Sequence, residues 1–104
     1  MATWKILATV AEFQKTDRKY VEVDDDTQIG IFKTEDGELR AVSPWCTHAK
    51  VSLINGDIIG CEVMCPLHGA RFDLNTGQHL SPPAVRPLKT YPLKTEDGNV
   101  LVEV

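Results

Sequence analysis

The chain has 104 residues, of which 42% are hydrophobic and 25% charged, and its formal net charge is −4. This length and composition favour one soluble globular domain, and the acidic balance argues against nucleic acid as the main partner. No apolar run approaches the ~18 residues of a membrane span, and the first residues do not resemble a signal peptide. Three cysteines, two of them close to a histidine, favour a metal site in a reducing compartment, so we expect a cytoplasmic protein.

The first half of the chain consists of short β-type segments separated by turn signals. We expect a strand over residues 4–8, and then a single helical turn over 9–13 that starts with Thr9 and Glu12 at capping-box spacing. A second strand over residues 20–23 alternates apolar and acidic side chains, as a half-buried strand does.

Two hairpins are predicted from turn residues between β-type segments. Glu35-Asp36-Gly37 separates residues 29–33 from residues 39–42, and Asp97-Gly98-Asn99 separates residues 88–95 from residues 100–104. No amphipathic pattern is long enough for an ordinary helix. The sequence therefore predicts an all-β fold, a small antiparallel sandwich or barrel, as a single domain over residues 1–104.

The region from about 44 to 87 is less regular and contains every cysteine and histidine of the chain. Two clusters stand out within it, Trp45-Cys46-Thr47-His48 and Cys65-Pro66-Leu67-His68-Gly69. Each cluster offers one thiolate and one imidazole, and Asn55-Gly56 between them provides a turn that would bring the two loops together. Two thiolates and two imidazoles suit zinc or iron.

The order of the ligands distinguishes these metals. A common zinc finger groups cysteine with cysteine and histidine with histidine, whereas here the two types are interleaved. Interleaving suits a two-iron cluster, in which each loop gives its cysteine to one iron and its histidine to the other. A structural zinc-binding module remains the alternative.

The two clusters resemble the cluster-binding boxes of the Rieske [2Fe-2S] family. The continuation Ala70-Arg71-Phe72-Asp73, then Thr76-Gly77 and Pro82-Pro83, is similar to the ferredoxin branch that serves bacterial ring-hydroxylating dioxygenase systems. The resemblance implies a Rieske fold with a cluster-binding subdomain of two loops at about residues 44–87. It also implies one [2Fe-2S] cluster held by Cys46 and Cys65 on one iron and by His48 and His68 on the other.

The resemblance also bears on the reduction potential. High-potential relatives join the two boxes by a disulfide and place hydroxyl groups near the cluster sulfurs. The matching positions here are Val51 and Leu67 for the disulfide, and Ala70 and Phe72 for the hydroxyl groups. We therefore expect a potential at the low end of the Rieske range, roughly −150 mV.

By this resemblance the chain is an electron carrier and not an enzyme. It would take electrons from an NAD(P)H-dependent flavoprotein reductase and pass them to a terminal oxygenase, with aromatic hydrocarbons as the expected substrate class of the system. The alternative is a small Rieske-like subunit of a nitrite reductase. We expect a monomer that binds neither nucleic acid nor membrane.

Several residues outside the proposed ligand set also have expected roles. Docking to partners should use the tip where the histidines emerge, and the candidate contacts there are Trp45, Ala49, Lys50, Leu67 and Pro82-Pro83. The acidic run Glu22 to Asp26 is interpreted as a solvated strand end and turn, with a reductase-docking patch as the alternative. Cys61 is expected to be a buried small hydrophobic residue in a strand, and His79 a surface histidine.

Overall fold

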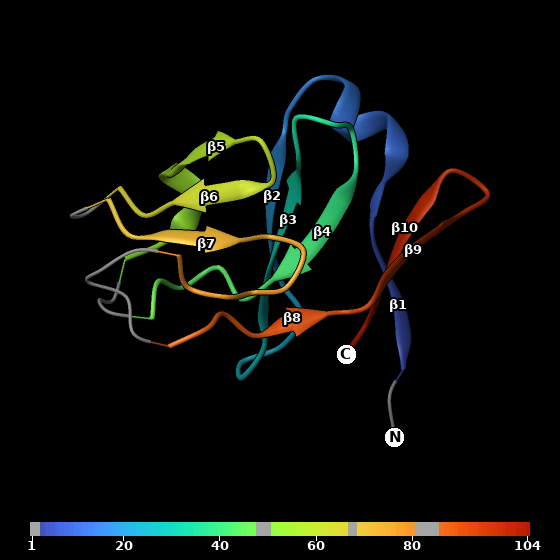
Figure 1. The fold of residues 1–104 in the computed structure, drawn as a ribbon. Helices are drawn as coiled ribbons and strands as arrows, with labels where there is room; N and C mark the ends of the chain where they lie inside the picture. The colour runs from blue at the N-terminus through green and yellow to red at the C-terminus, as the bar shows by residue number, and fades with distance from the viewer. Residues whose placement is uncertain (1–2, 48–50, 67–68, 81–85) are drawn as a thin grey trace.

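The computed structural model describes residues 3–47, 51–66, 69–80 and 86–104. These residues form three antiparallel sheets, with strand orders β1-β10-β9, β2-β3-β4-β8 and β5-β6-β7 (Figure 1). The strands are β1 (Trp4–Thr9), β2 (Arg18–Glu22), β3 (Gln28–Lys33), β4 (Leu39–Val42), β5 (Asp57–Ile59), β6 (Glu62–Met64), β7 (Arg71–Asp73), β8 (Thr90–Tyr91), β9 (Leu93–Glu96) and β10 (Asn99–Glu103). The described ranges contain no α-helix, only the 3₁₀ turns η1 (Val10–Gln14) and η2 (Leu53–Asn55). The all-β prediction is confirmed.

The first two sheets pack against each other around one apolar core. On β10, Val100 and Val102 are fully buried, and they pack against Ile29 and Ile31 of β3. Side chains two residues apart on a strand point to the same face, so β10 buries one apolar face. Close packing of β-branched side chains between two sheets gives the small sandwich expected from the sequence.

Both predicted hairpins are present. Gly37 has a φ of +92° in the β3–β4 connection, and Asp97 and Gly98 have φ values of +54° and +78° in the β9–β10 connection. Two consecutive residues with positive φ match the twist of the flanking strands, and Asp-Gly is a favoured pair for such a turn. The predicted helical turn is also present, as η1. Thr9 caps its N-terminus, and the Thr9 backbone N–H donates to Glu12 Oε2 at 2.5 Å.

The prediction of one continuous strand over 88–95 is wrong. Pro92 separates β8, which pairs with β4, from β9, which pairs with β10. Proline has no N–H to donate to a ladder, so the chain changes sheets at this residue. The change of sheet at Pro92 therefore joins the two sheets of the sandwich.

The third sheet, β5-β6-β7, was not predicted, and it lies on the opposite side of the molecule from the β9–β10 hairpin (Figure 1). Its central strand carries Val63, which is fully buried together with Phe72 of β7 and Leu53 of η2. The small sheet therefore packs into a second apolar cluster, which it shares with Phe32 of β3 and Val42 of β4. Among the described residues, no helix has the length and apolar character needed to cross a membrane.

Candidate metal centre

The first cysteine box lies at the base of a loop closed by backbone hydrogen bonds. The Cys46 N–H donates to the Val51 carbonyl at 2.9 Å, and Leu53 N–H donates to the Pro44 carbonyl at 2.6 Å. Trp45 and Ser52 form an isolated antiparallel bridge between these two bonds. The two arms of the loop are thus paired like a short hairpin, and Cys46 is fixed where the loop begins.

The second box has the same construction. It connects β6 to β7, whose last pair is Met64 and Arg71, and the Cys65 N–H donates to the Ala70 carbonyl at 2.6 Å. In both boxes the cysteine N–H therefore bonds to the carbonyl five residues further along the chain. Gly69 closes the second loop with a φ of +71°, a conformation that favours glycine. This equivalence of the two loops is not visible in the sequence spacing of cysteine and histidine.

Both cysteines are buried in one apolar cluster. Cys46 is 5% exposed and Cys65 is 1% exposed, and the cluster around them includes Ala70, Phe72 and Leu88. Two soft sulfur donors from two loops, in an apolar surrounding that limits access of water, suit an iron–sulfur cluster. His48 and His68 lie outside the described residues. Within the described ranges, no group of three or more histidine, cysteine, aspartate or glutamate side chains gathers to form a rival metal centre.

Arg18 ties the sandwich to the segment between the boxes. From β2, its Nη1 donates to the carbonyl of Ile54 at 2.8 Å and also to the carbonyl of Gly56. Asp17 orients the guanidinium group by accepting from Arg18 Nε at 2.8 Å, and this hydrogen bond holds the pKa of Asp17 below its ordinary value. Gly56 itself is required by close packing, since a Cβ there would overlap the carbonyl oxygen of Met64.

A second tie joins the first box to the C-terminal part of the chain. The Thr47 hydroxyl, one residue after Cys46, donates to the Arg86 carbonyl at 2.8 Å. Leu88, two residues further on, is 4% exposed and belongs to the core cluster that contains both cysteines. The segment that precedes β8 is therefore fixed against the first box.

Comparison with known proteins identifies the family. Residues 3–92 match the Rieske [2Fe-2S] domain. This chain belongs to the Rieske [2Fe-2S] family. Its cofactor is therefore a Rieske-type [2Fe-2S] cluster, and the two buried thiols at the loop bases fit such a group.

Three similar proteins show how far the likeness extends. The 3-phenylpropionate/cinnamic acid dioxygenase ferredoxin subunit of Photorhabdus laumondii is 40% identical over 99 residues, which cover 94% of this chain and 91% of that protein. A similar solved structure is a chain from the complex of reduced oxygenase and oxidized ferredoxin in carbazole 1,9a-dioxygenase. The superposition has a TM-score of 0.87 at 26% identity and covers 95% of this chain and 91% of that chain. The putative NADH-dependent nitrite reductase small subunit of Mycobacterium tuberculosis has a TM-score of 0.84 at 23% identity, covers 100% of this chain and 96% of that chain, and shows the fold alone.

The residues that this Rieske chain places around its cysteines carry few polar groups. Ala70 and Phe72 are fully buried in the same cluster as Cys46 and Cys65, and Val51 packs against it. None of these side chains has a hydroxyl group to donate. Leu67, the other position named for the missing disulfide, lies outside the described residues.

The structure places His79 as predicted, but Cys61 differently. His79 is exposed, as predicted. Cys61 is not in a strand: it lies in the turn between β5 and β6 after Gly60, whose φ is +61°, and it is only half-buried. Its Sγ lies 3.8 Å from Asp36 Oδ2. Of the predicted docking contacts, Trp45 is exposed, whereas Ala49, Lys50, Leu67 and Pro82-Pro83 lie outside the described residues.

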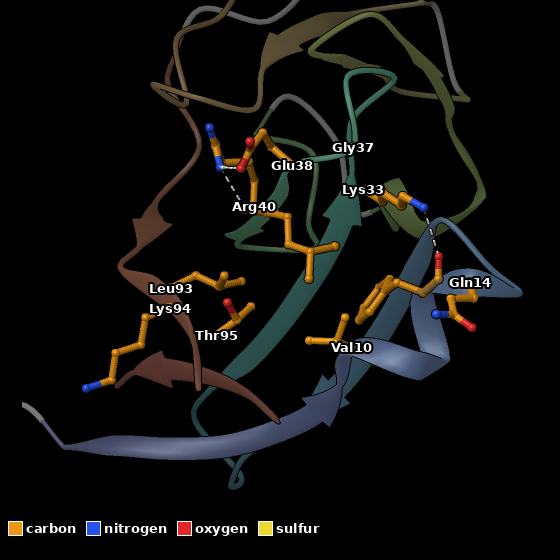
Figure 2. A pocket seen from close by; sticks show the side chains of 11 residues that line it. Val10, Gln14, Lys33, Gly37, Glu38, Arg40, Leu93, Lys94 and Thr95 are labelled. Carbon is orange, nitrogen blue, oxygen red and sulfur yellow. Dashed lines mark hydrogen bonds and ion pairs between the residues drawn. The ribbon is translucent and has the colours of Figure 1, made fainter. Parts of the chain in front are cut away.

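One groove of the described residues lies outside the cysteine boxes. It has a volume of about 420 Å³ and lies between η1, β4 and β9 (Figure 2), away from both cysteine boxes. Its cationic side chains have partners: Lys33 donates to the Phe13 carbonyl at 3.1 Å, Arg40 donates to Asn75 Oδ1 at 2.7 Å, and Lys94 lies 3.7 Å from Glu96. Among the residues that line it, the groove therefore offers a ligand no cation without a partner.

Proposed function

We propose that this chain is a soluble one-electron carrier that receives electrons from an NAD(P)H-dependent flavoprotein reductase and passes them to a terminal aromatic-ring dioxygenase. The observation that carries the proposal is the pair of buried cysteines at the bases of two matched loops. The likeness to a dioxygenase ferredoxin subunit over nearly the whole chain supports the role of carrier. Relatives of the chain are named as a ferredoxin subunit or a ferredoxin component of dioxygenase systems, so the chain is an electron-transfer component and not an enzyme.

Four residues would hold the cluster. Cys46 and Cys65 would bind the inner iron, and His48 and His68 the outer iron. When bound, the cluster supplies one reversible electron-transfer step. With two thiolates, two sulfides and two ferric ions, the oxidised site is formally neutral, whereas four thiolates would give −2. Adding an electron to a neutral site is easier, which places Rieske potentials above those of plant-type ferredoxins.

The surrounding side chains would then lower the potential within the Rieske range. Hydroxyl donors near the sulfurs stabilise the more negative reduced state, and the buried Ala70 and Phe72 offer none. We therefore propose a midpoint potential of roughly −150 mV. Such a value suits a carrier placed between a flavoprotein and an oxygenase.

Several further assignments belong to the same proposal. The chain would act as a single domain, with residues 44–87 as its cluster-binding part, in the cytoplasm and as a monomer. The nitrite reductase alternative is less favoured, because the likeness to that subunit extends to the fold alone. A zinc module is disfavoured by membership of the Rieske [2Fe-2S] family.

The ligand set is tested by iron analysis, sulfide analysis and EPR on the protein and on two single variants. The protein should hold two irons and two sulfides, and should show the EPR signal of a reduced cluster with mixed nitrogen and sulfur ligands. His48→Ala and His68→Ala should each lose that signal, whereas His79→Ala, at an exposed position, should keep it. Retention of an unchanged signal in either ligand variant would refute the assignment of that histidine.

A further inference from the structure

Two exposed aromatic side chains lie in edge contact beside the first box. Tyr20 on β2 and Trp45, which precedes Cys46, have ring centroids 6.3 Å apart and ring planes inclined at 77°. Tyr20 is 39% exposed and Trp45 is 42% exposed. An edge-to-face pair restricts both rings. The pair therefore presents an ordered aromatic surface to solvent, one residue along the chain from a buried cysteine.

Gln28 joins this aromatic pair to the acidic turn between β2 and β3. The Trp45 indole Nε1–H donates to Gln28 Oε1 at 3.3 Å. At its other end, Gln28 Nε2 donates to the carbonyls of Asp24 and Asp25 at 3.5 and 3.3 Å. The turn is closed further by the Asp26 N–H, which donates to Asp24 Oδ1 at 2.9 Å. The turn is thus held in a fixed position beside the indole.

The carboxylates of this turn are available to a partner. Asp24, Asp25 and Asp26 are exposed, and within the described ranges none of them forms an ion pair with a lysine or arginine. Exposed tryptophan is an uncommon feature that is enriched at the energetic centres of protein interfaces. A rigid aromatic group next to unpaired negative charge suits a basic face that places a cation over the indole ring.

We propose that this aromatic–acidic surface, formed by Tyr20, Trp45, Gln28 and residues 24–26, docks a basic face of the terminal oxygenase. The inference rests on the proposed function. The oxygenase is chosen as the occupant because a ferredoxin with the same fold is found in complex with its oxygenase. Consecutive Cα atoms are ~3.8 Å apart, so a partner seated on Trp45 comes within short reach of the Cys46 ligand and its cluster.

The aromatic part of the surface is tested by the dissociation constant between the cluster-loaded chain and the terminal oxygenase purified from the same host. Trp45→Ala should raise the constant about tenfold, as loss of an interface tryptophan does. Trp4→Ala is the matched control, because Trp4 is 38% exposed but lies on β1 of the other sheet. It should change the constant less than twofold. Gln28→Ala leaves the indole in place but removes its anchor, and should raise the constant about threefold.

The acidic part is tested by the association rate at low and high salt. The double change Asp25→Asn with Asp26→Asn should slow association several-fold at low salt and flatten its salt dependence. The matched pair Glu35→Gln with Asp97→Asn removes two exposed charges elsewhere, and should have a much smaller effect. The cluster spectrum and midpoint potential of each variant show that the site is intact. Asp24 is left unchanged because its carboxylate closes the turn.

The outcomes separate this inference from the proposed function. If the unmodified chain does not bind or reduce the oxygenase, the proposed function fails and this inference fails with it. If the unmodified chain binds, but Trp45→Ala and Gln28→Ala behave like Trp4→Ala, only the docking surface is refuted. A loss of affinity seen with a flavoprotein reductase but not with the oxygenase would also overturn the assignment of the occupant.

Discussion

Removing the Arg18 guanidinium group should destabilise the chain and loosen the segment between the two boxes. In Arg18→Met, the carbonyls of Ile54 and Gly56 each lose a charged donor. A hydrogen bond to a charged group contributes about 1.5–3 kcal/mol. The Arg18 side chain is 23% exposed, so water replaces part of this loss, and we expect a net cost of about 2–3 kcal/mol.

The assay is urea unfolding of the cluster-loaded protein at a fixed incubation time, followed by cluster absorbance and by far-UV circular dichroism. For a domain of this size, the expected cost lowers the urea midpoint by about 1–2 M. Hydrogen exchange of the Gly56 amide, which donates to the Leu53 carbonyl, should be faster in the variant. Arg18→Lys should give an intermediate loss, because a single ammonium group does not reproduce the guanidinium fork.

The control is Lys94→Met. Lys94 lies 3.7 Å from Glu96 in a pair whose side chains are 45% and 62% exposed, and such a surface pair contributes less than about 1 kcal/mol. If Arg18→Met lowers the midpoint no more than Lys94→Met does, the Arg18 contacts do not hold the two parts of the chain together.

Three other substitutions test the fold and the site. Gly77→Ala should lower the free energy of unfolding, measured in urea, by more than about 2 kcal/mol. Gly77 has a φ of +78°, and a Cβ there would overlap the Leu88 carbonyl oxygen. A loss below about 0.5 kcal/mol would contradict this prediction. Phe72→Tyr places a hydroxyl at a buried position, and a hydrogen bond from it to the cluster should raise the midpoint potential by roughly 60–130 mV in voltammetry. An unchanged potential would show that position 72 does not tune the site. The hydrogen bond from the Thr34 hydroxyl lowers the pKa of Asp36, so this carboxylate stabilises the fold above pH ~4 and the stabilisation is lost as the pH falls. Asp36→Asn should therefore reduce the fall in the free energy of unfolding between neutral pH and pH values below ~4, measured by urea unfolding at each pH. The same fall in the variant as in the unmodified chain would refute the role of Asp36.

The outer hairpins were predictable because their information is local. Asp97-Gly98 specifies a tight turn with two positive φ values, and alternation along the next strand assigns its buried face. The cysteine boxes were likewise predictable as a pair, because chemically distinctive residues recur in short motifs. In each case the few residues that decide the structure are adjacent in the sequence.

The third sheet was not predictable in the same way. Its strands have three residues each, which is too short for alternation to distinguish a strand from a loop. The assignment of Cys61 to a strand failed for a related reason, since the left-handed Gly60 turns the chain immediately before it. The break at Pro92 was signalled by the sequence, because proline interrupts a ladder, but the change of sheet depends on tertiary pairing.

The contacts that position the site join residues distant in the sequence. Arg18 bonds to carbonyls 36 and 38 residues further on, and Trp45 bonds to Gln28 across 17 residues. No local pattern marks such pairs. The equal closure of the two loops, from each cysteine N–H to the carbonyl five residues on, also required the structure.

The most direct test of the account is anaerobic mixing of the reduced chain with the oxidised terminal oxygenase from its host, followed by stopped-flow absorbance. We expect each chain to give up one electron, and the absorbance of its oxidised Rieske cluster to return as the oxygenase is reduced. A chain that takes up no electron from dithionite, or a reduced chain that leaves the oxygenase oxidised, would contradict the claim that this protein is the carrier.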